Sequence, residues 1–207
     1  MKRSYSRYNL LQEKLRGNRP KRLFHSFFSS GRKYITLVVG YYDYLRGKVF
    51  IDDLLDTFEE APEFDIAVLI HLLYQDFMNQ IKKGYDNRQI ALFLRKKKTE
   101  YLEADKQEKK VMKQVTQNIF TFETTEEDVE SPHGEREKQA HITIRIKETE
   151  LLRGEIFLHD LSPFMAHTTL TIEDLMVILY LDFIKQVKEN GNSSKIQKSI
   201  LHRLNNL

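Results

Sequence analysis

The chain contains no cysteine and no tryptophan, and only 8 of its 207 residues are glycine and 4 are proline. The lack of cysteine excludes a disulfide framework and any zinc site with thiolate ligands. Glycine is scarce, and neither a GxxxxGK[ST] nor a GxGxxG phosphate-binding loop occurs. The longest apolar runs, at residues 67–74 and 175–181, are far shorter than the about 20 residues that cross a bilayer. We therefore expect a cytoplasmic protein without a transmembrane segment.

Candidate catalytic groups form no recognisable pattern. No histidine pair has the HExxH spacing, and a GxSxG nucleophile elbow is absent. His71 lies in an apolar run, which is typical of a histidine in a core. The carboxylate pair Asp52-Asp53 lies where a helix is expected to begin, so helix capping explains it. The sequence thus predicts a protein that is not an enzyme and has no metal or cofactor site.

Two segments of the chain resemble each other, which indicates an internal duplication. Residues 34–54 align without a gap with residues 141–161, and one gap extends the match. Two unrelated amphipathic segments would share only apolar positions, whereas here polar residues and glycines also match. The identical pairs include Thr36 and Thr143, Arg46-Gly47 and Arg153-Gly154, Asp53 and Asp160, Tyr74 and Tyr180, Asp76 and Asp182, and Gln80 and Gln186.

Each copy is predicted to begin with two strands. Ile142, Ile144 and Ile146 alternate with polar residues, which is typical of a half-buried strand, and residues 35–39 show the same pattern. The segments just upstream are predicted to pair with these strands in hairpins. They comprise residues 23–27 in the first copy and 119–122 in the second.

Three helices are predicted to follow the strands in each copy. A short β-type step at residues 49–50 or 156–157 leads into a short helix. A long apolar helix comes next, over residues 65–83 or 172–189. Thr171 is expected to cap the second of these long helices, Gly84 and Gly191 are expected to end them, and a last helix follows each glycine.

The predicted fold is therefore α+β and helix-rich, with two tandem ββααα repeats joined by a charged helix. The two repeat units are expected to pack against each other. The expected organisation is a basic N-terminal arm over residues 1–21, a first unit over 22–97, a charged connecting helix over 98–117, and a second unit over 118–207 with a mobile acidic loop at 125–138.

The segment FIDDLLDTFEEAPEFDIAVLIHLLYQDFMNQIKKG, residues 50–84, resembles the C-terminal winged helix of bacterial kleisins. In both, a short acidic helix precedes a long apolar helix that ends in basic residues. The resemblance implies tandem winged-helix-like units and an accessory role in a larger, DNA-associated complex. The chain departs from that pattern after Gly84, where helix and not a β wing is expected.

Positive charge is concentrated at the N-terminus although the net charge is only +3. Residues 1–33 carry a charge of about +9 with aromatic residues interleaved, a pattern that suits phosphate backbones and stacked bases. The alternative is that this arm docks on an acidic surface, or packs on the core as a helix through Tyr8, Leu11 and Leu15. The candidate nucleic-acid-binding residues are Arg3, Arg7, Lys14, Arg16, Arg19, Lys21 and Arg22.

The repeated Arg-Gly and Asp positions suggest a second candidate site. Gly47 and Gly154 would supply a special backbone angle, with each arginine pairing with Asp53 or Asp160 or capping a carbonyl. In the alternative interpretation, Arg46 and Arg153 form a symmetric anion site. The function predicted from all these features is that of a non-catalytic regulatory or adaptor protein acting through a protein partner. The alternatives are binding of DNA or RNA, and, more weakly, an enzyme with a site between the units.

Overall fold

The computed structural model describes residues 10–15, 31–103, 106–116, 119–128 and 138–205, with the backbone alone for 13–14, 106–116 and 119–128. Within these ranges the chain has a helix-rich α+β fold. Its helices are α1 (Leu10–Leu15), α2 (Tyr41–Thr57), α3 (Ile66–Lys82), α4 (Asn87–Leu102), α5 (Glu148–Leu161), α6 (Ile172–Asn190) and α7 (Ser194–Leu204), with a short 3-10 helix, η2 (Ser162–Phe164). Its strands are β1 (Arg32–Gly40), β2 (Lys106–Thr116), β3 (Ile119–Asp128) and β4 (Gln139–Lys147).

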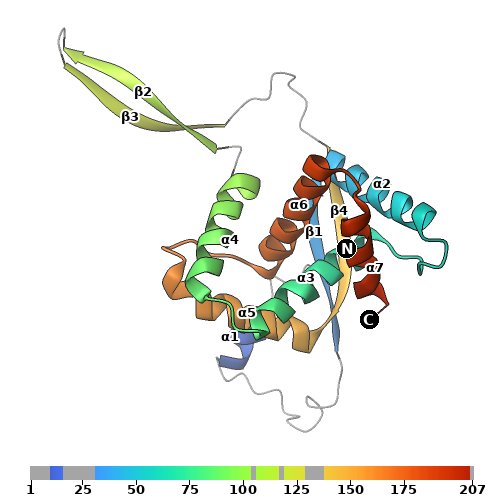
Figure 1. Cartoon of the computed structure of the whole chain (residues 1–207). Coiled ribbons are helices and arrows are strands. Elements are labelled where there is room, and N and C mark those ends of the chain that lie inside the picture. Colours follow the sequence, from blue (N-terminus) through green and yellow to red (C-terminus); the bar gives the residue numbers. More distant parts are fainter. Residues whose placement is uncertain (1–9, 16–30, 104–105, 117–118, 129–137, 206–207) are drawn as a thin grey trace.

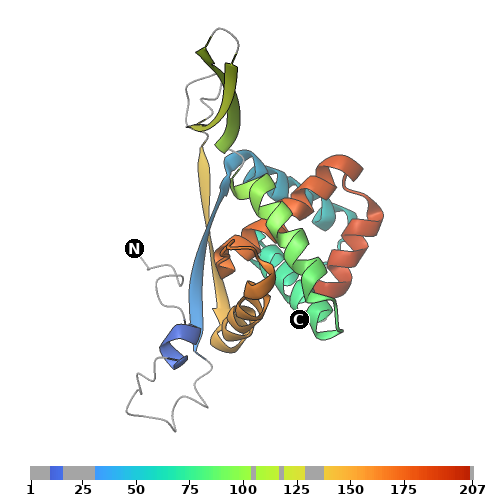
Figure 2. The same ribbon diagram turned by 90° about the vertical axis from the view of Figure 1, so that its left-hand side faces the viewer.

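A long antiparallel ribbon of β1 and β4 forms one side of the main body, and the helices pack against it (Figures 1 and 2). In its register Thr36 lies opposite Thr143, Ile35 opposite Ile144, and Leu37 opposite Ile142. The alternation predicted for both strands is confirmed, because every second residue is buried and forms one continuous apolar face. That face packs against α3, which contacts β4, and against α6, which contacts β1.

The predicted long helices and their ends are also confirmed. Asp65 caps α3, accepting a hydrogen bond from the Val68 amide. Thr171 caps α6 in a capping box with Asp174. Gly84 follows α3 with a φ of 95° and Gly191 follows α6 with a φ of 65°, a region that glycine adopts without steric cost.

The predicted strand pairing is wrong. β4 pairs with β1 from more than a hundred residues away, and β3 pairs with β2. The hairpin predictions relied on proximity in sequence, whereas an apolar strand face is equally satisfied by any partner that continues it. The other predicted partner strand, residues 23–27, lies outside the described residues. Each predicted unit thus contributes one strand to the β1–β4 ribbon, followed by three α-helices, and the second unit also contains β3.

The charged connecting helix predicted over residues 98–117 is also wrong. α4 ends at Leu102, and β2 then forms a separate two-stranded sheet with β3. Lysine, glutamine and glutamate favour helix, but helix propensity is a small preference that pairing with a neighbouring strand overrides here. This hairpin stands apart from the helices in Figure 1. The predicted acidic loop at 125–138 is shortened accordingly, because residues 125–128 belong to β3 and 129–137 lie outside the described part.

The β-type steps predicted at residues 49–50 and 156–157 are helical, inside α2 and α5. As predicted, a helix, α4, follows Gly84 in place of a β wing. Among the described helices, none combines the length and hydrophobicity that crossing a bilayer requires.

Candidate functional site

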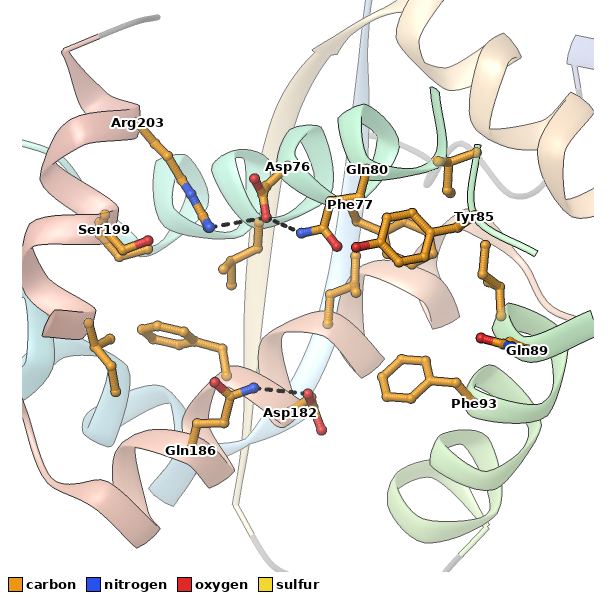
Figure 3. Close-up of a pocket in the computed structure, with 17 residues that line it drawn as sticks. Asp76, Phe77, Gln80, Tyr85, Gln89, Phe93, Asp182, Gln186, Ser199 and Arg203 are labelled. Atoms are coloured by element: carbon orange, nitrogen blue, oxygen red, sulfur yellow. Dashed lines mark hydrogen bonds and ion pairs between the residues drawn. The ribbon is translucent and has the colours of Figure 1, made fainter. Parts of the chain in front are cut away.

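An open pocket of about 560 Å³ lies between α3, α4, α6 and α7, and we call it the four-helix groove (Figure 3). Its apolar surface comes mainly from α3 and α6, and the start of α4 and the length of α7 form its two walls. Tyr85 and Phe93 lie at the α4 end and are 58% and 37% exposed. The apolar lining residues are Leu73, Phe77, Ile81, Tyr85, Ile90, Phe93, Leu179, Phe183, Ile196 and Ile200.

Two matched carboxylate–amide pairs border this apolar surface. On α3 the Gln80 amide donates to Asp76 at 2.7 Å, and on α6 the Gln186 amide donates to Asp182 at 3.2 Å. Each pair spans one helical turn, so both side chains lie on the same face of their helix. Figure 3 shows the two pairs facing each other across the groove.

A cation from the wall helices neutralises each carboxylate. Arg203 of α7 lies 3.1 Å from Asp76, and Lys97 of α4 lies 2.8 Å from Asp182. Desolvation by burial lowers the pKa of Lys97, but hydrogen bonds to Asp182 and to two further groups raise it above its ordinary value. Each aspartate thus contacts both a cation and the amide of the glutamine one turn away on its own helix.

A second ion pair extends this network along α4 and α6. Lys185 lies 2.6 Å from Glu100, and its hydrogen bond lowers the pKa of Glu100. Lys97 also contacts Glu100, at 3.2 Å. The groove therefore offers apolar contact bordered by amides and neutralised carboxylates, which is the chemistry of a binding surface.

Candidate metal ligands do not gather anywhere in the described ranges. No group of three or more histidine, aspartate or glutamate side chains there is placed to hold a metal ion. His71 contacts Glu150 at 2.9 Å and Gln75 at 3.3 Å, which links α3 to the start of α5. This half-buried histidine thus has a structural role.

The special backbone angle expected at the repeated Arg-Gly positions is not observed, and the anion site of Arg46 and Arg153 stays a prediction. Gly47 and Gly154 lie inside helices, and among the described glycines only Gly84 and Gly191 have positive φ. Neither arginine forms an ion pair with the aspartate of its own helix within the described residues. Asp53 instead accepts a hydrogen bond from Asn192. None of Arg46, Arg153, Asp53 and Asp160 lines the four-helix groove.

The two glycines have a different role, because they allow close packing of tyrosines. A Cβ atom at Gly47 would overlap the Tyr180 hydroxyl, and one at Gly154 would overlap the Tyr74 hydroxyl. Each hydroxyl donates to a backbone carbonyl beside its glycine, Tyr180 to Asp43 at 2.8 Å and Tyr74 to Glu150 at 2.9 Å. Burial raises the pKa of both tyrosines.

The basic N-terminal arm is described only at α1. Leu10 is buried, α1 contacts α5, and the Leu11 amide donates to Glu155 Oε2 at 2.7 Å. This part of the arm therefore packs on the core as a helix, which was one of the predicted alternatives, but Leu15, one of the residues predicted to pack, is 70% exposed. Nucleic-acid binding by the arm stays a prediction, because Arg3, Arg7, Arg16, Arg19, Lys21, Arg22 and the Lys14 side chain lie outside the described part of the chain.

The sequence singled out Asp76, Asp182 and the two glutamines but missed their cationic partners. The internal alignment matches Ile90 with Ile196 in the last helices, and seven residues further on it matches Lys97 with Arg203. That conserved positive charge was the signal that could have found them. No family model matches the chain, and neither a curated protein nor a solved structure shows significant similarity to it.

Proposed function

We propose that this chain is an internally duplicated, non-catalytic adaptor or regulatory protein, and that the four-helix groove binds a segment of a partner protein. The observation that carries the proposal is the groove itself, about 560 Å³ of largely apolar space between four helices. Partner-binding grooves combine an apolar centre with a polar rim, and both are present here.

Reciprocal contacts support the duplication. Three kinds of contact each occur twice, and in each pair the two copies exchange roles. The pairs are the hydrogen bonds Tyr74 to Glu150 and Tyr180 to Asp43, the aromatic contacts Phe50–Phe183 and Phe77–Phe157, and the ion pairs Lys97–Asp182 and Arg203–Asp76. The Thr36–Thr143 pair in the ribbon joins equivalent residues directly, as expected where a twofold axis crosses antiparallel strands.

A non-catalytic role is supported by the state of the groove's charged groups. Both of its aspartates already contact a cation and an amide. A general base must lie within hydrogen-bond reach of the proton that it abstracts, and these contacts occupy both carboxylates. The groove offers shape and hydrogen bonding for a partner.

Site-specific photocrosslinking in the native host cell tests this function. A photoreactive amino acid at Gln89, an exposed groove residue, is expected to capture a protein partner. The same amino acid at Thr143, on the exposed face of β4, is the matched control and is expected to capture none. Ser199 lines the groove on α7, and Ser199→Trp would fill it and abolish capture at Gln89. Capture that is equal at Thr143, or unchanged in Ser199→Trp, would contradict the proposal.

A further inference from the structure

We infer that the occupant of the four-helix groove is an acidic amphipathic helix of the partner protein, an inference that rests on the proposed function. Exposed lysines lie beside the α7 wall of the groove. They are Lys195 and Lys198.

On α7 these two lysines lie next to the groove. Ile196, Ser199, Ile200 and Arg203 line the groove at helical spacing. Lys195 and Lys198 each precede one of these lining positions. Successive helical residues are about 100° apart, so the two lysines lie together on the adjoining face.

The wall helices provide little negative charge to neutralise these cations. α7 contains no aspartate or glutamate. Asp86, in the α3–α4 turn, caps α4 by accepting a hydrogen bond from the Arg88 amide. The groove aspartates are already paired with Arg203 and Lys97. A partner therefore meets an excess of positive charge on the α7 side of an apolar strip, and carboxylates complement it.

The arrangement favours a helix over an extended segment. An amphipathic helix presents one apolar stripe and has polar flanks on both sides of it. Laid in the groove, its apolar stripe meets the α3 and α6 surface while an acidic flank reaches the lysines of α7. An extended strand alternates its side chains between opposite faces, so its charged side chains would point away from α7.

A fluorescence anisotropy titration of the full chain tests this inference. The probe is a labelled 16-residue peptide with leucine and phenylalanine at i, i+3, i+4 and i+7 and glutamate elsewhere. We expect a Kd on the order of 1–10 μM near physiological salt, weakening as salt rises. A scrambled peptide and a peptide with lysine for glutamate are each expected to bind at least roughly tenfold more weakly.

Charge-reversal variants locate the binding surface. Lys195→Glu with Lys198→Glu should weaken the acidic peptide at least roughly tenfold. Lys48→Glu with Lys147→Glu makes the same change in net charge at exposed positions that do not line the groove, and should change Kd less than about twofold. Circular dichroism melts verify that both double variants are folded.

Three results would overturn the inference. The first is that the lysine peptide or the scrambled peptide binds as tightly as the acidic peptide. The second is that both double variants weaken binding of the acidic peptide equally. The third is that a DNA or RNA oligonucleotide binds more tightly than the acidic peptide and that Lys195→Glu with Lys198→Glu abolishes its binding. If Gln89 captures a partner while the acidic peptide fails to bind, the acidic helix is refuted and the proposed function stands. If Gln89 captures nothing as well, both fall.

Discussion

Replacing Gly47 by alanine adds a methyl group at the point where α2 meets the Tyr180 hydroxyl. At an ordinary interior position of a helix this change stabilises by about 1 kcal/mol, because glycine is a poor helix former. Here the new carbon overlaps the hydroxyl oxygen, so α2 and α6 must separate. Overpacking costs about 1–3 kcal/mol, and losing the hydrogen bond to Asp43 costs about 1 kcal/mol more. We expect Gly47→Ala to destabilise by about 1–3 kcal/mol.

In a Tyr180→Phe background, Gly47→Ala is no longer expected to destabilise the protein. Tyr180→Phe alone removes one hydrogen bond and should cost about 0.5–1.5 kcal/mol. It also removes the overlapping atom, and the next nearest ring atoms lie 3.2 and 3.4 Å from the added Cβ of Gly47→Ala. The double variant should therefore be about as stable as Tyr180→Phe, or up to about 1 kcal/mol more stable. The coupling energy between the two sites is then about 1–4 kcal/mol.

Urea unfolding at 25 °C of the wild type, both single variants and the double variant measures this coupling. The pair Gly154→Ala and Tyr74→Phe is the matched comparison. There rescue should be only partial, because Ile172 Cδ1 would still lie 2.7 Å from the added carbon. If Gly47→Ala costs the same free energy with and without the Tyr180 hydroxyl, the close approach is not the reason for glycine at this position.

Three other predictions concern the buried tyrosines, the ion pairs and the connection between the halves. Burial raises the pKa of Tyr74 and Tyr180, so their contribution to stability is complete below the unfolded pKa of about 10 and is lost as pH rises from there through the folded pKa. Urea unfolding between pH 8 and 11 should show this loss of stability, and replacing both tyrosines by phenylalanine should abolish the pH dependence. In the same assay Lys97→Met should lower the free energy of unfolding by about 1–3 kcal/mol and Arg203→Met by less than about 1 kcal/mol. The Lys97 side chain is 13% exposed and that of Arg203 31%, so the Lys97 ion pair is the more buried, and equal losses would contradict this ranking. Residues 1–117 and 118–207, co-expressed as separate chains, should co-purify as a folded complex, because the reciprocal contacts join them; independent folding of either half would refute the exchange of contacts.

The candidate site was visible in the sequence only in part. The repeated aspartate and glutamine positions were recognised because identical polar residues occur at aligned positions of the sequence. Their placement in one groove required α3 and α6 to pack side by side. Tyr85 and Phe93 were not predicted as site residues, because an exposed aromatic side chain leaves no sequence pattern that distinguishes it from a buried one.

Local interactions explain what the sequence determined. The half-buried strands, the long helices, the Thr171 cap and the glycine stops all depend on residues within about four positions of each other, so the pattern of residues alone specifies them. Helix-forming residues did not ensure a helix at 106–116, where backbone pairing between strands decided the outcome.

Only the tertiary structure decided which strand pairs with which and what the paired glycines do. The period-2 pattern of β1 is satisfied by any partner strand that continues its apolar face, and the pairing with β4 depends on helices α3 and α6 covering both strands at once. Gly47 is a plain helical residue in the sequence, and its need for the smallest side chain arises because the Tyr180 hydroxyl reaches it from a helix more than a hundred residues away. Such requirements come from the close packing of distant segments, which no local pattern encodes.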